Sequence, residues 1–253
     1  MRHNAKTVLP ITAHHFDAVL FDLDGVITKT ASVHAACWKK LFDDFLRQYA
    51  AKTAQTFVPF DIVADYARYV DGKLRWEGVR DFLAARNIFL PPGTQDDPPG
   101  IHTIHALALR KDDLFTVVLQ EKGVDILVDG LALVQHVRAA GLKTAVVSSS
   151  KNCQMVLQMA HIEQLFDIRV DGVTAEQLQL QGKPAPDPFL KAAELLDVVP
   201  QRAVVVEDAL SGVQSGVRGN FGLVVAVDRL GNAAALYESG ADLVVTDLRS
   251  LIV

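Results

Sequence analysis

Short runs of apolar, mostly β-branched residues recur along the chain and predict strands buried on both faces. One run lies near the N-terminus, and the others follow residue 140. Unbroken apolar runs of this kind are typical of parallel sheets that are covered on both sides. The predicted strands are, in chain order, residues 17–21, 144–147, 168–170, 203–206, 223–227 and 243–245.

Apolar residues between these runs recur three and four positions apart, which is the pattern of amphipathic helices. After residue 120 such helices alternate with the strands, at residues 131–140, 152–160, 188–196 and 210–217. Strands that alternate with helices indicate βαβ crossovers and a parallel sheet with helices on both of its faces.

Residues 35–120 differ from the rest, because they show helical patterns and no strand candidate. An aromatic stripe predicts a helix over residues 38–49, the pattern is repeated over residues 63–70, and residues 104–119 suggest one long helix. Gly72 and Gly78 separate two further short helical pieces, and residues 91–100, rich in proline and glycine, predict a loop.

These patterns predict an α/β protein with a Rossmann-like parallel-sheet core, helices on both faces of the sheet, and a small all-helical domain inserted after the first strand. We expect the leader, the first strand and a hinge at residues 1–33. The helical domain is expected at residues 34–120, and the rest of the core at residues 121–253.

The composition is that of a globular protein with no sign of a nucleic-acid or membrane partner. Half of the 253 residues are hydrophobic, and the formal net charge is −5. The N-terminus lacks a signal-peptide pattern, and Cys37 and Cys153 lack metal-ligand spacing, which favours the reducing cytoplasm. His3, His14 and His15 suit a solvated leader better than a metal site. A monomer is the default expectation.

Two aspartates directly after the first strand give the first chemical signal. Asp22 and Asp24 are two residues apart and point the same way at the carboxyl end of the strand, where open parallel sheets bind ligands. Gly25 then permits a sharp departure of the chain. Two such carboxylates repel each other unless a cation, a shared proton or a lysine lies near them. A turn with solvated aspartates is the alternative.

Polar residues follow the later strands in the same way. Ser148 offers a hydroxyl and the N–H groups of a helix start to an anion, or else it caps that helix. Lys183 lies in a proline-rich loop, which favours a fixed position over a solvated one. Glu207 and Asp208 supply oxygen ligands suited to Mg²⁺, with helix capping as the alternative for Asp208.

Taken in this order, the residues resemble the four motifs of the haloacid dehalogenase superfamily of phosphotransferases: Asp22-Leu23-Asp24-Gly25, Ser148, Lys183 and Glu207-Asp208. The resemblance implies that the helical insert is a mobile cap. It also implies that Asp22 is the nucleophile, that Asp24 is the general acid and base, and that Ser148 and Lys183 hold the phosphoryl oxygens. The implied ligands of Mg²⁺ are Asp22, the backbone carbonyl of Asp24, Glu207 and Asp208.

The detail is similar to the β-phosphoglucomutase subfamily, through residues 21–28, 148–152 and 182–187. Such a mutase binds a sugar bisphosphate in two orientations, which implies a second phosphate site. The implied substrate-binding residues are Thr30, His34, Arg75, Lys111, Ser150, Lys151 and Asn152. Arg75 and the last three would bind the second phosphate, and His34 would lie by the hinge. Lys111 is expected near the sugar and Asp24, with the charged face of a helix as the alternative.

Lys29 departs from the subfamily pattern, which usually has an acid between the two threonines at this point. The reversed charge puts the expected hinge contacts in question and leaves the catalytic set intact.

The leading hypothesis is a Mg²⁺-dependent mutase that interconverts β-D-glucose 1-phosphate and glucose 6-phosphate, with glucose 1,6-bisphosphate as intermediate and activator. The runner-up is a sugar-phosphate phosphatase with the same nucleophile and water as the acceptor. A dehalogenase is a weaker interpretation, because the members that cleave carbon–halogen bonds lack the second aspartate. An inactive sugar-phosphate-binding module predicts the loss of Asp22 or of a metal acid, and the sequence retains them all.

Overall fold

The computed structural model describes residues 10–252 and has two compact units. We call residues 10–29 together with 124–252 the core unit, and Thr30–Gly123 the helical unit. The first part of the expected leader, including His3, lies outside the described residues. His14 and His15 lie in a turn before the first strand, where the His15 Nδ1 atom is 3.1 Å from the Thr12 hydroxyl.

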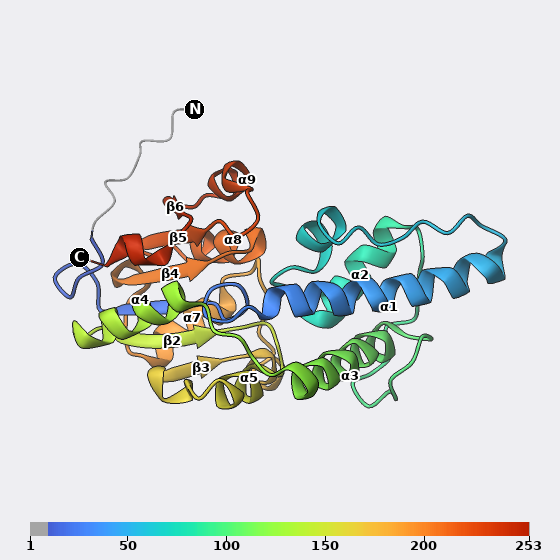
Figure 1. Cartoon of the computed structure of the whole chain (residues 1–253), viewed down its shortest axis with the longest axis horizontal. Coiled ribbons are helices and arrows are strands. Elements are labelled where there is room, and N and C mark those ends of the chain that lie inside the picture. The colour runs from blue at the N-terminus through green and yellow to red at the C-terminus, as the bar shows by residue number, and fades with distance from the viewer. Residues whose placement is uncertain (1–9, 253) are drawn as a thin grey trace. The chain divides into compact units, whose positions relative to one another are not determined.

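The described part of the core unit contains one parallel sheet of six strands (Figure 1). Their order across the sheet is β3 (Ile168–Val170), β2 (Lys143–Val147), β1 (Ala18–Phe21), β4 (Ala203–Glu207), β5 (Leu223–Val227) and β6 (Leu243–Val245). β1 lies in the middle and is buried along its whole length. Burial on both faces explains why its sequence is an unbroken apolar run.

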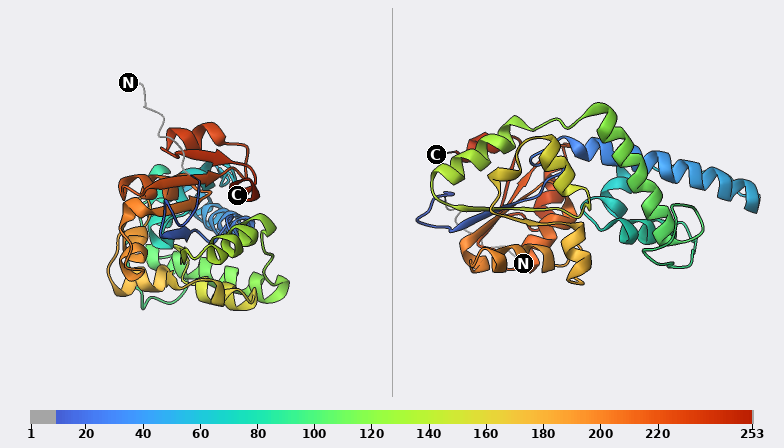
Figure 2. Two further views of the ribbon diagram at one scale, coloured as in Figure 1. Left: turned by 90° about the vertical axis from the view of Figure 1, so that its left-hand side faces the viewer. Right: turned by 90° about the horizontal axis from the view of Figure 1, so that it is seen from below.

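Helices cover both faces of the sheet, as the right-hand view of Figure 2 shows. The chain moves outward from β1 through β2 to β3, and in the opposite direction from β4 to β6, so right-handed crossovers place the connecting helices on opposite faces. On one face lie α4 (Val128–Ala139) and α5 (Cys153–Met159); on the other lie α7 (Asp187–Leu195), α8 (Leu210–Arg218) and α9 (Ala233–Glu238). Shorter elements are α6 (Gly172–Gln177) and the 3₁₀ turns η2 (Glu163–Leu165), η3 (Pro200–Arg202) and η4 (Leu248–Leu251).

The layer between the sheet and α7 and α8 is a continuous apolar core. Phe189 of α7 is fully buried and meets Phe221 nearly edge-on, with 6.1 Å between the ring centroids. Leu20 and Val205, from the neighbouring strands β1 and β4, pack in the same cluster. This packing fixes the strands whose carboxyl ends carry the polar residues singled out above.

The helical unit consists of α1 (Thr30–Thr53), a π-helical turn η1 (Tyr66–Val70), α2 (Arg75–Ala85) and α3 (Ile104–Lys122), with no strand among residues 30–123. Its core is strongly aromatic. The ring centroid of Phe42 lies 5.2 Å from that of Trp38, 5.1 Å from that of Phe60 and 4.1 Å from that of Phe82. The aromatic stripe of the sequence is therefore a packing surface.

One local prediction is wrong. Gly78 lies inside α2 and does not separate two helical pieces. A Cβ atom at this position would lie 3.1 Å from Cγ1 of Val70, so a glycine here lets α2 approach η1 closely. The sequence pattern indicates a break in the helix at Gly78, whereas in the structure this glycine marks a close contact between α2 and η1.

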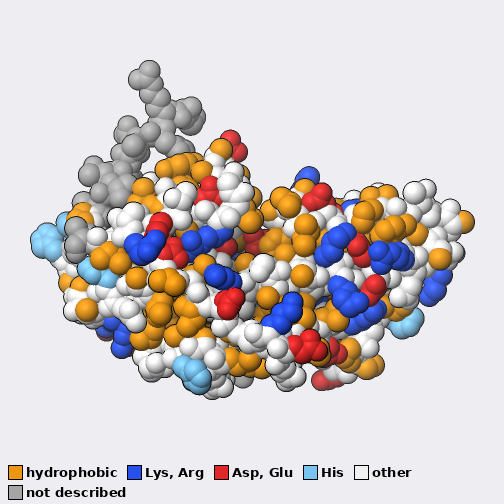
Figure 3. All heavy atoms as spheres, in the orientation of Figure 1, with side chains coloured by type: hydrophobic (Ala, Val, Ile, Leu, Met, Phe, Trp, Pro, Cys, Tyr) orange, Lys and Arg blue, Asp and Glu red, His pale blue; other side chains and the backbone are white. Residues whose placement is uncertain are grey.

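The predicted fold class is confirmed: an α/β core with a parallel sheet, and an all-helical unit inserted after its first strand. Three predicted strands, residues 168–170, 223–227 and 243–245, have the observed bounds. On the surface drawn in Figure 3, Lys and Arg side chains lie beside Asp and Glu side chains, so that neither sign dominates that face. Among the described residues, we find no helix with the length and apolar character needed to cross a membrane.

Candidate active site

Three carboxylates meet at the carboxyl ends of β1 and β4. These two strands are neighbours, and Phe21 pairs with Val206, so Asp22 and Glu207 directly follow paired positions. Asp22, Glu207 and Asp208 each offer an oxygen atom within 4.8 Å of the others. Glu207 is fully buried and Asp22 is 6% exposed. A cluster of carboxylate oxygens of this kind is the donor set that Mg²⁺ prefers.

The Lys183 ammonium lies between two of these acids. It donates to Oδ1 of Asp22 and to Oε1 of Glu207, both at 2.6 Å, and to the carbonyl of Val147 at 3.0 Å. Its three donors are therefore matched to three acceptors at the carboxyl ends of β1, β2 and β4. Lys183 is 1% exposed, so its side chain is held in place as we expect and is not solvated.

Charge and burial act against each other in this cluster. Burial raises the pKa of Asp22 well above its ordinary value; Lys183 opposes the rise, while Glu207 and Asp24 add to it. Burial also tends to lower the pKa of Lys183, but Asp22 and Glu207 outweigh it and raise that pKa. The single ammonium of Lys183 does not balance the charges of Asp22, Glu207 and Asp208, and the cluster therefore suits a further cation.

Glu207 also holds the start of α8. Its Oε2 atom accepts hydrogen bonds from the backbone N–H groups of Asp208 and Ala209, at 3.1 and 3.2 Å. A Cβ atom at Gly212 would lie 1.8 Å from Oε1 of Glu207, so only a glycine in the first turn of α8 leaves room for this side chain. The N-cap position of α8 is Ala209, the residue after Asp208.

Asp24 and Ser148 lie in the loops after the neighbouring strands β1 and β2, close to each other. The Ser148 hydroxyl donates to Oδ2 of Asp24 at 3.4 Å. Ser148 directly follows β2, which pairs with β1, so this serine lies beside the loop after β1 that carries Asp24. Ser148 is 4% exposed, and its oxygen accepts from the Ser150 N–H at 3.1 Å, which folds the loop after β2.

The loop after β2 carries the other predicted core residues. The Ser150 hydroxyl accepts from the Asn152 N–H at 3.1 Å, and Asn152 is the residue before α5. Lys151 forms an ion pair with Glu176 of α6, with about a third of each side chain exposed. Glu176 is a partner that sequence reasoning missed, because the two residues are 25 positions apart and belong to different elements.

The remaining predicted residues belong to the helical unit. Thr30 begins α1 and is 2% exposed. Arg75, the first residue of α2, is paired with Asp112 of α3. His34 contacts the Lys111 ammonium through Nδ1, and its ring stacks on Phe115 with 3.9 Å between centroids.

Lys111 does not lie on a solvated charged face, so that alternative is wrong. It is 1% exposed. Its ammonium lies 4.6 Å from the ring centroid of Phe115 and 5.3 Å from that of Trp38. Aromatic faces attract a desolvated ammonium, which explains how this cation is accommodated inside the unit.

The structure therefore brings the predicted core residues together at one edge of the sheet, and gathers His34 and Lys111 within the helical unit. Lys29, the residue that departs from the subfamily pattern, has an exposed side chain, and its N–H group donates to the carbonyl of Asp125 at 2.9 Å.

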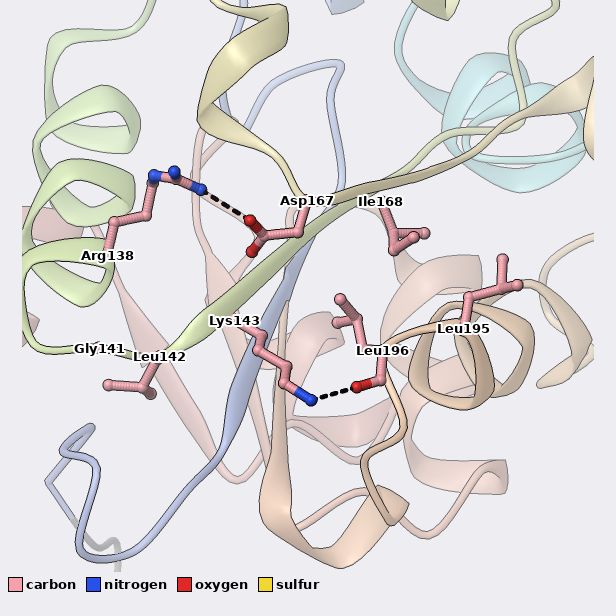
Figure 4. Close-up of a pocket in the computed structure, with 8 residues that line it drawn as sticks. All are labelled: Arg138, Gly141, Leu142, Lys143, Asp167, Ile168, Leu195 and Leu196. Atoms are coloured by element: carbon pink, nitrogen blue, oxygen red, sulfur yellow. Dashed lines mark hydrogen bonds and ion pairs between the residues drawn. The ribbon is translucent and has the colours of Figure 1, made fainter.

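A separate surface pocket of about 510 Å³ lies at the other end of the sheet (Figure 4). Its charged groups already have partners: Arg138 is 3.3 Å from Asp167, and the Lys143 ammonium donates to the Leu196 carbonyl at 2.5 Å. Lys143 and Ile168 begin β2 and β3, so this pocket lies away from the carboxylate cluster. It is not part of the candidate active site.

A family model of haloacid dehalogenase-like hydrolases matches residues 16–220. The chain belongs to this family. A β-phosphoglucomutase of Mycobacterium bovis is 49% identical over 238 residues, which cover 93% of this chain and 91% of the relative. A longer Mycobacterium tuberculosis protein, described as an uncharacterized glycosyl hydrolase, is 35% identical over 96% of this chain and 18% of its own length. The solved structure of a β-phosphoglucomutase from Clostridium difficile is 28% identical, covers 93% of both chains and has a TM-score of 0.71.

These comparisons confirm the predicted superfamily and its β-phosphoglucomutase-like branch, and with them an enzyme of the phosphosugar-mutase type. The roles of individual residues stay predictions.

The role of Lys183 in this haloacid dehalogenase-like site is tested by replacing it with methionine, which keeps the length of the side chain. Lys183→Met leaves two buried carboxylates without their ammonium, and we expect the free energy of unfolding to fall by about 3–5 kcal/mol. Urea denaturation at neutral pH without divalent cations measures this. Added Mg²⁺ is expected to restore part of the loss.

Lys191→Met is the matched control. The Lys191 ion pair with Glu194 is on the surface of α7, where Glu194 is 68% exposed, and its removal is expected to change stability by less than about 1 kcal/mol. Equal stability of Lys183→Met and the unmodified protein would contradict the charge balance described above.

Proposed function

We propose that the chain is a Mg²⁺-dependent β-phosphoglucomutase that interconverts β-D-glucose 1-phosphate and glucose 6-phosphate. The 49% identity with a β-phosphoglucomutase over nearly the whole length of both chains is the observation that carries the proposal. The carboxylate cluster with its buried lysine supports it independently, because phosphoryl transfer needs a nucleophile surrounded by groups that offset negative charge.

Asp22 is the proposed nucleophile. Its carboxylate attacks phosphorus and forms an aspartyl-phosphate while the bond from phosphorus to the sugar oxygen breaks, which divides one transfer into two. The contact of 2.6 Å between Oδ1 of Asp22 and the Lys183 ammonium supports this role, because it fixes the orientation of the carboxylate. The Ser148 hydroxyl is proposed to hold the phosphoryl oxygens together with Lys183, which would exchange one of its three protein acceptors for a phosphoryl oxygen.

Asp24 is the proposed general acid and base. It gives a proton to the departing sugar oxygen and takes one from the hydroxyl that attacks in the second half-reaction. Its contact with Ser148, itself at the end of the neighbouring strand, supports a position beside the reacting phosphoryl group.

Mg²⁺ is the proposed cofactor, with Asp22, the Asp24 carbonyl, Glu207 and Asp208 as the residues that would hold it. The donor set fits: three of these residues offer carboxylate oxygens within 4.8 Å of one another. When bound, Mg²⁺ supplies positive charge that offsets the charge on the transferring phosphoryl group.

A mutase has to bind the phosphate that is not reacting, and Arg75, Lys151, Ser150 and Asn152 are the proposed residues. Arg75 and Lys151 are cations with partly exposed ion-pair partners, Asp112 and Glu176. The Lys151–Glu176 pair is about one-third exposed, and such a pair is worth only about 0–1 kcal/mol, so a phosphate dianion can replace the carboxylate there. Arg75 suits this exchange because its guanidinium binds phosphate through two parallel hydrogen bonds. Thr30, His34 and Lys111 are proposed to contact the sugar in the cap.

Glucose 1,6-bisphosphate is the proposed intermediate and activator. The aspartyl-phosphate transfers its phosphoryl group to the C6 hydroxyl of β-glucose 1-phosphate, and the resulting bisphosphate turns round before Asp22 accepts the group from C1. The uncharacterized glycosyl hydrolase from Mycobacterium tuberculosis, in which a related segment is part of a longer chain, supports a substrate from carbohydrate metabolism. A monomer in the cytoplasm stays a prediction.

A sugar-phosphate phosphatase remains the second candidate, supported by the name of the matching family, which is a family of hydrolases. The first half-reaction is the same, and water replaces the sugar hydroxyl as the acceptor in the second.

The proposal predicts that the purified protein with Mg²⁺ converts β-glucose 1-phosphate to glucose 6-phosphate, and that a trace of glucose 1,6-bisphosphate is needed for full rate. Glucose 6-phosphate is followed through a coupled dehydrogenase, and free phosphate is followed in parallel. Free phosphate formed without glucose 6-phosphate would favour the phosphatase. α-Glucose 1-phosphate serves as the control substrate, for which we expect little turnover.

The second phosphate site predicts a selective effect of Arg75→Ala. We expect the mutase rate at limiting substrate to fall by about 100-fold, since a bidentate contact to a phosphate is lost, and hydrolysis of p-nitrophenyl phosphate to change by less than about threefold. Arg80→Ala, on the same helix, is the control, because Arg80 is 52% exposed and lies over the ring of Trp76. Equal losses in both reactions would argue against a phosphate site at Arg75.

A further inference from the structure

Arg229, two residues beyond β5, lies at the carboxyl edge of the sheet and belongs to none of the four motifs. Its Nε atom donates to the carbonyl of Gly25 at 2.9 Å. Its Nη1 and Nη2 atoms donate to the two carboxylate oxygens of Asp129, at 2.9 and 3.1 Å. One guanidinium thus connects the turn after β1 to the first turn of α4.

Asp129 fixes this guanidinium in turn. It is 8% exposed and also accepts from the N–H group of Leu248 at 3.0 Å, which ties it to the C-terminal turn η4. Burial alone tends to raise the pKa of Asp129, but the hydrogen bonds from Arg229 and Leu248 outweigh it and hold the pKa below its ordinary value. The carboxylate therefore stays ionised and the pair stays closed in the neutral range.

The turn that Arg229 contacts is packed between two other elements. Gly25 has φ +91°, and a Cβ atom on it would lie 1.8 Å from Oδ2 of Asp208. On the other side, a Cβ atom on Gly130 of α4 would lie 2.0 Å from the carbonyl of Val26. Two glycines thus allow close contact of the turn with a carboxylate of the cluster and with α4.

The hydrogen bonds within the turn set the direction of the Asp24 carbonyl, a proposed ligand of the cation. The Gly25 N–H donates to the carbonyl of Thr28 at 2.7 Å, and the Thr28 N–H donates to the carbonyl of Leu23 at 2.9 Å. The N–H and C=O groups of one peptide are coplanar and point in opposite directions, so the bond from Gly25 orients the Asp24 carbonyl away from Thr28. Arg229 holds the next peptide, through the Gly25 carbonyl.

We propose that Arg229, held by Asp129, is a positioning residue that fixes the Asp24–Gly25 turn against Asp208 and thereby sets the affinity of the carboxylate cluster for its divalent cation. The proposal rests on the function proposed above. It assigns to Arg229 no contact with substrate, and its effect passes through Gly25. Groups that orient metal ligands from behind typically contribute a factor of about 10–100 to metal affinity.

Lysine at this position tests the proposal, because it keeps the positive charge and loses the fork that contacts Gly25 and Asp129 together. For Arg229→Lys we expect the dissociation constant of Mn²⁺, measured by electron paramagnetic resonance as a probe of the site, to rise about 10-fold. The Mg²⁺ concentration that half-saturates p-nitrophenyl phosphate hydrolysis should rise by the same factor, while kcat at saturating Mg²⁺ changes by less than about threefold.

Asp129→Asn is the second variant, and it keeps Arg229 while removing the charge that holds it. We expect a smaller rise of the Mn²⁺ dissociation constant, of about threefold. Arg202→Lys is the matched control: Arg202 makes a similar forked pair with Asp17, at 2.5 and 2.7 Å, next to the amino ends of β4 and β1. Its replacement is expected to leave the Mn²⁺ affinity unchanged.

The outcomes separate this proposal from its alternatives. The proposal is overturned if both Arg229→Lys and Asp129→Asn bind Mn²⁺ as tightly as the unmodified protein. Arg229 is then only a structural residue, even if the two variants melt at a lower temperature. If the unmodified protein itself binds no Mn²⁺ and hydrolyses no p-nitrophenyl phosphate, the failure is that of the proposed function. Weakened binding in the two variants and not in Arg202→Lys supports the role of Arg229.

Discussion

A lysine ammonium between two buried carboxylates is the interaction on which the site depends. Asp22 and Glu207 follow paired positions on neighbouring parallel strands, so the sheet itself brings two like charges together where little water reaches them. Lys183 makes this arrangement tolerable because each of its three donors has an acceptor at 2.6–3.0 Å. The remaining excess of negative charge is what suits the cluster to a divalent cation. The pairing of β1 with β4 therefore both builds the centre of the sheet and brings the two acids together.

Other features of the core serve to hold these groups at their distances. Glu207 is placed by two backbone N–H groups and by the absence of a side chain at Gly212. The turn after β1 is placed in the same manner, by Arg229 and by the close contact of Gly25 with Asp208. Glycines recur at these points because backbone and carboxylate approach each other more closely than a Cβ atom allows.

The sequence was sufficient to predict the strands and the core motifs, because both depend on local patterns. Residues 223–227 are a strand in an unbroken apolar run, and the polar residues that follow strands meet at one edge since parallel strands end together. Gly78 was misread because a glycine in a helix has the same local signal whether it ends the helix or admits a neighbour. The pairs Lys151–Glu176 and Arg229–Asp129 were missed because they join residues 25 and 100 positions apart. Arg229 did carry a usable signal, since it follows β5 at the edge where ligands bind.

The central claim is that Asp22 carries the phosphoryl group, and chemical trapping tests it most directly. The protein is mixed with Mg²⁺ and glucose 1,6-bisphosphate, quenched in acid and reduced with borohydride, which converts an aspartyl-phosphate to homoserine. Peptide mass spectrometry then locates the homoserine. We predict homoserine at position 22 of the unmodified protein and none in Asp22→Asn. Homoserine at Asp24 or at another aspartate, or turnover of the bisphosphate with Asp22 unmodified, would contradict the account.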